Sequence, residues 1–304
     1  MFAIDIHADD HQFVEQCYQL ALGRIPDASG LEGWMTGLAS GAVKRSGVVR
    51  AMLYSDERLS LAHRPYLDFE PLIEQFYRAW LRPGDTAIDV GAHSGRHSRP
   101  LYDVLSGASA GVPAKGGQLF LFEPIPSLAS ALRSHFEHST IPVTMFNCAV
   151  SDSEGTADFA VALDRPEESS LKERAQYNGT TRIQHVAVQL RTVDAAVADI
   201  TALHFVKIDV EGAEMGALRG ASKTLSRLRP VVEFESGGRS LGGFGFAADD
   251  VFDYFDGHRY VLFDILGTRL SRETFANSMS REQVWDYVAA PEESADSVQA
   301  IVAW

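Results

Sequence analysis

Carboxylate side chains occur at three points of the sequence where a short apolar stretch ends. Asp89 and Glu123 each lie at the end of such a stretch. Asp209 and Glu211 follow a third stretch, which also contains Lys207. Carboxylates that lie close together raise one another's pKa, and such groups can accept a proton or bind a cationic or hydroxyl-rich ligand. These residues are therefore the first candidates for a functional site.

The apolar stretches that hold these carboxylates alternate with longer segments of helical periodicity. The predicted strands are Thr86–Val90, Gln118–Phe122, Val143–Phe146, His204–Ile208 and Pro230–Phe234, and the predicted helices between and after them cover 97–105, 126–138, 214–228 and 247–256. Continuously apolar strands between helices indicate a parallel sheet that is covered on both faces. Parallel strands bring their carboxyl ends to one edge of the sheet, so Asp89, Glu123 and Asp209 are expected to meet there.

Three further features complete the predicted architecture. Residues 156–161 and 186–190 alternate between apolar and polar side chains, which predicts an inserted antiparallel hairpin. Tyr260–Phe263 and Val284–Val288 are expected to finish the sheet. The first sixty residues show helical periodicity, with Asp27 as an expected N-cap before a buried stripe that includes Leu31 and Trp34. We expect residues 1–64 to form a helical interaction module and residues 65–304 to form an α/β domain.

Composition narrows the classes of partner. The 304 residues include 27 Lys and Arg against 41 Asp and Glu, which gives a net charge of −14 and argues against binding to nucleic acid or to an anionic membrane. Cys17 and Cys148 are too few for a disulfide framework. We find neither a signal peptide nor an apolar stretch long enough to span a membrane. We therefore expect a cytoplasmic protein that does not insert into membranes.

The turn after the first predicted strand resembles a nucleotide-binding loop but lacks one of its glycines. Gly91 and Gly95 are present, and His93 stands where the dinucleotide fingerprint has its middle glycine. The loop alone does not distinguish a cofactor site from an ordinary strand–helix turn. Asp89 repels phosphate and suits a cation, and Glu123 is placed to accept hydrogen bonds from both hydroxyls of a ribose. A sulfonium, an ammonium and a ribose occur together in S-adenosylmethionine, so the charges favour this cofactor over NAD.

Several segments, in this order, resemble the FkbM-type S-adenosylmethionine-dependent methyltransferases. They are Ala87–Gly95, Leu121–Pro124, Asn147–Asp152, Ser169–Leu171, Arg191–Asp194, Phe205–Glu214 and Pro230–Glu235. The resemblance covers about residues 70–237, and Lys-Ile-Asp-Val-Glu-Gly-Ala-Glu is its most specific string. It implies a class I, Rossmann-like methyltransferase fold, which has a seven-stranded sheet of strand order 3-2-1-4-5-7-6 and an antiparallel last strand.

The resemblance also implies which residues contact S-adenosylmethionine. These are Asp89, Gly91, His93, Gly95, Glu123, Ser151, Asp152 and Asp209. Asp89 is expected near the methionine end and Glu123 at the ribose. Asp152 is expected near the adenine, although Ser151 could take that place. His93 departs from the family pattern, in which Asn is common, and could instead reach the substrate.

The implied reaction is O-methylation, in which a hydroxyl of a sugar, glycan or natural product attacks the cofactor methyl in line. A general base would help the hydroxyl to lose its proton. The candidates are Asp209, Glu211, Glu235 and His93, with Asp209 and Glu211 first. Mg²⁺ or Ca²⁺ would use similar oxygen ligands, but we expect a site without metal.

The helical start resembles a small bacterial domain of unknown function that contains Leu-Gly-Arg and Pro-Asp-x-x-Gly-x-x-x-Trp motifs. The resemblance covers about residues 10–60, implies no chemistry and leaves docking to a protein partner as the expected role. Two alternatives to a methyltransferase stay open at this point. One is a Rossmann oxidoreductase that uses NAD, and the other is a non-catalytic binding or assembly protein on a methyltransferase fold.

Overall fold

The computed structural model describes residues 2–5, 7–61, 67–108, 111, 114, 116–173 and 181–303. Its strands are β1 (Phe2–Ala3), β2 (Leu67–Asp68), β3 (Thr86–Val90), β4 (Gln118–Phe122), β5 (Val143–Phe146), β6 (Ala149–Val150), β7 (Gly155–Ala162), β8 (Ile183–Arg191), β9 (Phe205–Ile208), β10 (Val231–Glu235), β11 (Tyr260–Asp264), β12 (Arg269–Leu270) and β13 (Asp286–Pro291).

Helices α1 to α14 cover Asp10–Leu22, Ala28–Ala39, Arg45–Leu53, Asp56–Leu59, Glu70–Trp80, Ser98–Leu105, Pro126–His135, Val193–Ala196, Glu214–Gly220, Ser222–Leu228, Gly238–Gly243, Ala248–Gly257, Arg272–Arg281 and Ala295–Val302, in that order. Short 3₁₀ helices cover Pro166–Glu168 (η2) and Glu292–Ser294 (η4).

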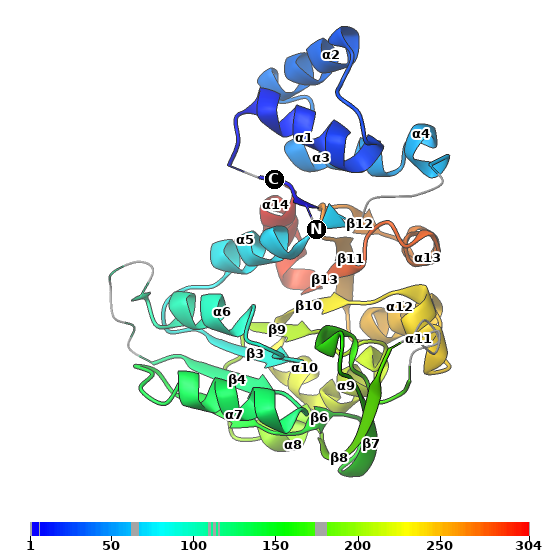
Figure 1. The fold of residues 1–304 in the computed structure, drawn as a ribbon. Helices are drawn as coiled ribbons and strands as arrows, with labels where there is room; N and C mark the ends of the chain where they lie inside the picture. The colour runs from blue at the N-terminus through cyan, green and yellow to red at the C-terminus, as the bar shows by residue number, and fades with distance from the viewer. Residues whose placement is uncertain are drawn as a thin grey trace.

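The central sheet has the strand order β12-β11-β13-β10-β9-β3-β4-β5 (Figure 1). Strands β5, β4, β3, β9 and β10 are parallel, and β13 is antiparallel to both β10 and β11. Without β12, this is the seven-stranded order that the family resemblance implies. The two-residue strand β12 is an eighth strand that the sequence analysis did not include, and it pairs with β11 at the edge.

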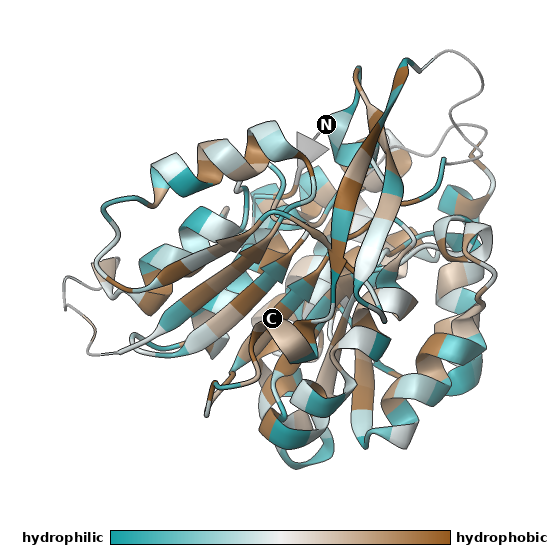
Figure 2. Ribbon diagram, turned by 90° about the horizontal axis from the view of Figure 1, so that it is seen from below, coloured by the Kyte–Doolittle hydropathy of each residue, from teal (hydrophilic) through white to brown (hydrophobic). Residues whose placement is uncertain are grey.

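Both faces of the sheet are buried, which explains the continuously apolar strands. On one face, β3, β9 and β10 contribute Ala87, Phe205 and Val231 to a core shared with α5, α6 and α14. On the other face, alternate strand residues pack against α9, α10 and α12. Figure 2 shows the apolar colour concentrated on the strands of the sheet, with polar colour on the outer sides of the helices.

The inserted segment after β5 forms the predicted antiparallel pair. Strand β7 pairs with β8 along its whole length, from Gly155 opposite Leu190 to Ala162 opposite Ile183, and the short strand β6 pairs with the other edge of β8. Phe159, Val161 and Val188 pack with Ile125 in a small apolar cluster beside the sheet. The insertion therefore has a core of its own, which fixes η2 near the carboxyl ends of the central strands.

The N-terminal region contains the predicted helices α1 to α4, accompanied by the strand β1, which pairs with β2. Asp27 caps α2, and its side chain accepts a hydrogen bond from the Gly30 amide as expected. The predicted buried stripe of α2 is only half-buried, and the main helix that α2 packs against is α1. The expected boundary after residue 64 lies outside the described residues.

This helical region docks on the C-terminal part of the chain (Figure 1). The Arg58 side chain donates to the Gln283 side chain over 3.2 Å, and Arg50 pairs with Asp264 at 3.5 Å. Lys44 donates to the Ala303 carbonyl. Among the described residues, no helix is both long and apolar enough to span a membrane.

Candidate cofactor and acceptor site

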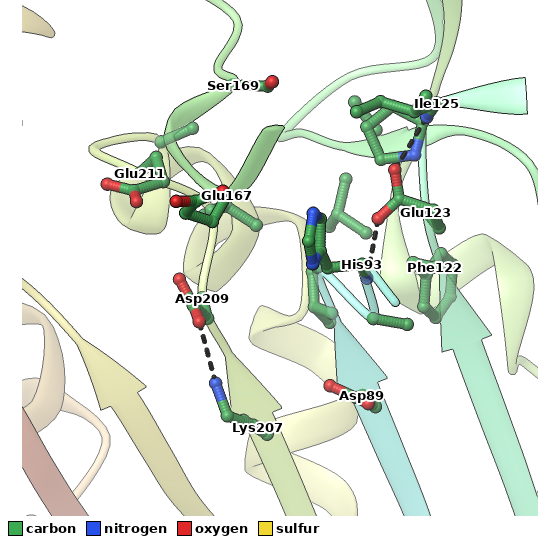
Figure 3. A pocket seen from close by; sticks show the side chains of 18 of the residues that line it. Asp89, His93, Phe122, Glu123, Ile125, Glu167, Ser169, Lys207, Asp209 and Glu211 are labelled. Atoms are coloured by element: carbon green, nitrogen blue, oxygen red, sulfur yellow. Dashed lines mark hydrogen bonds and ion pairs between the residues drawn. The ribbon is translucent and has the colours of Figure 1, made fainter. Parts of the chain in front are cut away.

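A cavity of about 340 Å³ opens at the carboxyl ends of β3, β4 and β9 (Figure 3). The glycine turn after β3, the end of β4, the segment after β9 and the η2 region of the insertion all line it. This is the edge at which open α/β sheets bind their ligands. Its position confirms that the sheet brings Asp89, Glu123, Asp209 and Glu211 to one cavity.

The glycine turn is held tightly against the neighbouring strands. Gly91 has a φ of +87°, and a Cβ there would lie 1.8 Å from the carbonyl oxygen of Asp209. The Gly91 amide donates to the Phe122 carbonyl over 3.0 Å. Only glycine permits this approach, so the turn and the segment after β9 form one rigid wall of the cavity.

His93 adopts a left-handed backbone conformation, with a φ of +46°. Such a conformation is strained for a non-glycine residue and is held here because the His93 amide donates to Glu123 Oε2 over 2.8 Å. The ring lies in the cavity, and its buried Nε2 has no hydrogen-bond partner among the described residues (Figure 3). His93 therefore holds, at the wall of the cavity, a buried ring nitrogen without a partner among the described residues.

Glu123 is held by two backbone amides at the end of β4. Its Oε1 accepts from the Ile125 amide over 2.7 Å and its Oε2 from the His93 amide. The side chain is 3% exposed. Burial raises the pKa of Glu123 to about 7, although the two amides lower it. The second lone pair of each oxygen can still accept a hydrogen bond, so Glu123 suits a pair of ribose hydroxyls.

We expect binding of S-adenosylhomocysteine, the cofactor product, to tighten as the pH rises through about 7. The ionised carboxylate is the better acceptor for ribose hydroxyls, and Glu123 loses its proton in this range. Calorimetric titration at pH 6 and pH 8 should show an affinity about tenfold higher at pH 8. In Glu123→Gln the affinity should be low at both values, and an unchanged pH dependence in this variant would contradict the assignment.

Lys207 lies beneath the cavity as a buried cation between acidic neighbours. In the register of the sheet, Asp89 of β3, Lys207 of β9 and Glu233 of β10 stand side by side. Lys207 is 2% exposed, and its Nζ donates to Asp209 Oδ2 over 3.1 Å (Figure 3). Burial alone would lower its pKa, but Asp209, Glu233 and Asp89 together raise it well above its ordinary value. Lys207 is thus the charged centre that fixes Asp209.

Further carboxyl groups surround this lysine, and not all of them face the cavity. Glu233 is fully buried, and neither of its oxygens has a hydrogen-bond partner among the described residues. Burial raises the pKa of Glu233 well above its ordinary value. Glu235 stands opposite Asp286 in the antiparallel pair, and burial also raises the pKa of both carboxyls, that of Asp286 to about 8.

Three acidic residues of the described cavity lining were missed by the sequence analysis. Asp68 and Glu70 come from β2 and α5, before the segments that resemble the family, and Glu167 comes from η2 of the insertion. Glu70 pairs with His97, and although burial raises its pKa, His97, Lys207 and Arg96 lower it to about 2. In the sequence, only the carboxylates at the ends of apolar stretches gave a signal, and these three residues lie elsewhere.

Four predicted site residues lie outside the lining of the cavity. Gly95 faces α7, where an added Cβ would lie 2.7 Å from the Leu132 side chain. Ser151 lies against α9, and Asp152 is exposed. The cavity wall next to them is formed by Cys148, Ala149 and Val150 instead. Glu235 stands opposite Asp286 in the pairing of β10 with β13.

Comparison with protein families identifies the family of this chain. The model of the methyltransferase FkbM domain matches residues 89–262, more than half of the chain. The chain belongs to the FkbM methyltransferase family. The family model describes a methyltransferase domain, and the central sheet has the strand order that the family resemblance implies. A domain of unknown function, DUF4214, matches residues 3–62, which agrees with the resemblance of the helical region.

Solved structures of other methyltransferases are similar to this chain at low identity. The FkbM methyltransferase of Methylobacillus flagellatus KT is 16% identical, with a TM-score of 0.44 over 90% of this chain and 58% of that chain. This chain thus spans less than two thirds of that protein. Aeropyrum pernix fibrillarin, which holds natively bound S-adenosyl-L-methionine, is 10% identical over 72% of this chain and 74% of that chain, with a TM-score of 0.38.

A third similar structure is the S-adenosylmethionine-dependent O-methyltransferase of Thermotoga maritima. It is 11% identical over 78% of this chain and 70% of that chain, with a TM-score of 0.35. No curated protein sequence matches this chain significantly.

The cavity residues fit the cofactor of the family. Glu123 offers carboxylate oxygens to a ribose, and His93 Nε2 offers an unsatisfied ring nitrogen. The glycine turn lets a ligand approach the backbone. The pyrophosphate of NAD would meet Asp89 and Glu123 here, and Arg96 and Lys207, the Arg and Lys side chains of the described lining, are already paired with carboxylates. In the described part of the chain, no group of three or more His, Cys, Asp or Glu side chains is arranged to hold a metal ion.

Proposed function

We propose that this FkbM-family enzyme methylates a hydroxyl group of a sugar, glycan or other natural product. The observation that carries this proposal is the position of Asp209, which Lys207 holds at 3.1 Å inside the cavity beside the glycine turn. When bound, S-adenosylmethionine supplies an electrophilic methyl group, which the acceptor oxygen takes as S-adenosylhomocysteine leaves.

In this proposal, Glu123 holds the ribose and Asp89 supports the methionine end from beneath the turn. Asp89 is fixed there by Ser98, which donates to it over 2.6 Å. Asp209 receives the proton of the acceptor hydroxyl, and Glu211, next to it in the cavity, is the second candidate for that role. His93 contacts the cofactor or the acceptor. These residues also shield the reaction from water and hold the two partners in line.

The helical region is proposed as an interaction module that brings a protein partner to residues 65–304, the methyltransferase domain. The alternative of a non-catalytic assembly protein relies on the same module. A cytoplasmic location is proposed as well, because both Cys17 and Cys148 are buried free thiols.

We expect Asp209→Asn to reduce methyl transfer about 100-fold or more, because the amide keeps the shape of the carboxylate but cannot accept the proton. The measurement is transfer of a labelled methyl group to a panel of glycans and small hydroxylated acceptors. S-adenosylhomocysteine binding should persist in this variant, which separates lost chemistry from lost folding. Asp199→Asn, an exposed acidic residue in the loop before β9, is the matched control and should retain full activity.

A wild-type enzyme that binds S-adenosylhomocysteine but transfers no methyl group to any hydroxyl acceptor of the panel would contradict the proposed O-methylation. Such a result would favour the non-catalytic alternative. Equal rates for wild type and variant on a good acceptor would instead remove Asp209 from the role of base and leave the reaction class unchanged.

A further inference from the structure

The glycine-rich segment that contains α11, residues 236–246, packs directly against the turn that follows β9 and contains Glu211. An added Cβ at Gly212, the next residue of that turn, would lie 2.7 Å from the Ser240 carbonyl oxygen and 2.9 Å from the Phe244 ring. Both distances are too short for a Cβ, so the lack of a side chain at this position is what lets the α11 segment approach. The Phe244 ring therefore lies against the backbone of the turn.

The α11 segment is anchored in the core of the domain. Leu241 is fully buried among the side chains with which α9 and α12 pack on the sheet. The Phe244 amide donates to the Leu241 carbonyl over 3.0 Å, and the Gly245 amide donates to the Gly242 carbonyl over 3.0 Å. Phe244 thus extends from a compact and anchored turn, so its ring can fix the position of the groups that it contacts.

The same ring also contacts the insertion after β5. The Lys172 ammonium lies 4.8 Å from the centroid of the Phe244 ring, and it donates to the Gly243 carbonyl over 3.4 Å. An ammonium at this distance from an aromatic face is attracted to it. Lys172 directly follows Leu171, which lines the cavity. Phe244 therefore connects the insertion with the turn after β9.

The two parts that Phe244 connects form one side of the cavity. Glu167 of the insertion and Asp209 of the segment after β9 lie in one part of the cavity in Figure 3, away from Glu123. The Ser170 hydroxyl of the insertion donates to a backbone carbonyl of the turn, that of Glu211, over 2.9 Å. Because the proposed function places the ribose of the cofactor at Glu123, the acceptor is expected between the insertion and the turn.

We propose that Phe244 is a positioning residue for methyl transfer. Phe244 lies outside the described lining of the cavity, so it acts through its contacts with Gly212 and Lys172. Its ring holds the turn and the insertion at the separation at which an acceptor hydroxyl meets Asp209. Because a small misplacement of reacting groups slows a reaction strongly, a residue outside the cavity can control the rate. This inference rests on the proposed function, which assigns Asp209 to the acceptor.

Hydrogen exchange of the protein with S-adenosylhomocysteine tests whether the ring holds both parts, and it needs no acceptor. Exchange is followed in two peptides. One contains Ser170, whose amide donates to the Ala160 carbonyl over 3.1 Å, and the other contains Gly212, whose amide donates to Glu214 Oε1 over 2.7 Å. Phe244→Leu stays apolar but removes the ring, so both peptides should exchange about threefold faster. Phe244→Tyr keeps the ring and should retain the wild-type rates.

Methyl transfer to the panel of hydroxylated acceptors measures the consequence for the reaction. In Phe244→Leu, kcat should fall about tenfold or more, because the acceptor and Asp209 are no longer held in line. The affinity for S-adenosylhomocysteine should stay within about twofold of the wild type, because the Glu123 side of the cavity is not changed. Phe244→Tyr should keep most of the wild-type kcat.

Phe246→Leu is the matched control. Phe246 belongs to the same segment, but the cation over its ring is Arg219 of α9, which lies outside the described cavity lining. This variant should leave both the exchange rates and kcat unchanged. Unchanged exchange of either peptide in Phe244→Leu, a normal kcat in that variant, or equal losses in both leucine variants would overturn the inference. A wild type that transfers no methyl group to any acceptor would instead overturn the proposed function.

Discussion

Replacing Lys207 by methionine should destabilise the protein by about 3–5 kcal/mol, the loss expected when one partner of a buried ion pair is removed. The ammonium is 2% exposed and is the cation beside Asp209, Glu233 and Asp89. Methionine retains the length of the side chain but leaves these carboxyl groups without a counter-charge. Urea unfolding of the wild type and the variant at pH 7 measures the difference.

Glu233→Gln provides the rescue experiment for this variant. Lys207 lowers the pKa of Glu233, so in Lys207→Met this buried carboxyl keeps its proton at pH 7 at a greater free-energy cost. Gln at this position removes that cost, so the double variant should lose less stability than the sum of the single effects predicts. Lys207→Met should also lose affinity for S-adenosylhomocysteine, since Asp209 is no longer fixed. A loss below about 1 kcal/mol in the single variant would show that Asp89, Asp209 and Glu233 do not need the positive charge of Lys207.

Because Glu233 is buried, we also expect the free energy of unfolding to depend on pH, and the direction of this dependence follows from the raised pKa. Its pKa in the folded state is raised well above 4.5, so the folded protein keeps this proton after the unfolded chain has lost it. The contribution of Glu233 is therefore most favourable below about pH 4.5 and declines as the pH rises toward the folded pKa. The free energy of unfolding between pH 5 and pH 8 should decline more steeply in the wild type than in Glu233→Gln.

The sequence predicted the central strands closely because they are buried on both faces. Strands β3 and β4 begin and end at the predicted residues, since near-continuous apolar runs bounded by glycine, proline and polar residues leave little choice of register. The edge strand β5 also matches its predicted bounds, although it is only partly buried. The carboxylates at the strand tips then converge for a topological reason. Parallel pairing alone brings Asp89, Glu123 and Asp209 to one edge.

The rest of the cavity depends on contacts between distant segments, which no local pattern encodes. Glu167 reaches it because the β7–β8 pair packs on Ile125, and Glu70 reaches it because α5 covers the sheet. The same cause explains the residues placed elsewhere. Asp152 comes two residues after Val150, which lines the cavity, but the chain turns toward β8 there, where the Ser151 amide donates to the Arg191 carbonyl.

Gly91→Ala should have the largest effect of any single methyl group added to the site. The new Cβ would lie 1.8 Å from the Asp209 carbonyl oxygen, far inside van der Waals contact, so β3 and the segment after β9 must separate. Backbone strain at a φ of +87° adds about 1–2 kcal/mol, and overpacking adds about 1–3 kcal/mol. We expect a total destabilisation of about 2–5 kcal/mol.

The same movement should weaken S-adenosylhomocysteine binding by more than about 100-fold, because Asp209 and the glycine turn are two halves of one cavity wall. Gly245→Ala is the matched control. Gly245 has a nearly equal φ of +84°, but an added Cβ meets nothing within 4 Å, so this variant carries the backbone strain without the collision. It should lose only about 1–2 kcal/mol of stability and keep its affinity for S-adenosylhomocysteine.

Comparing the two alanine variants therefore isolates the close approach between β3 and the segment after β9. If Gly91→Ala and Gly245→Ala lose equal stability and both bind S-adenosylhomocysteine normally, the turn tolerates a side chain and the rigid wall inferred from the structure is wrong. If only Gly91→Ala fails to bind at a temperature where both variants remain folded, the glycine is required for the cofactor site itself and not merely for folding.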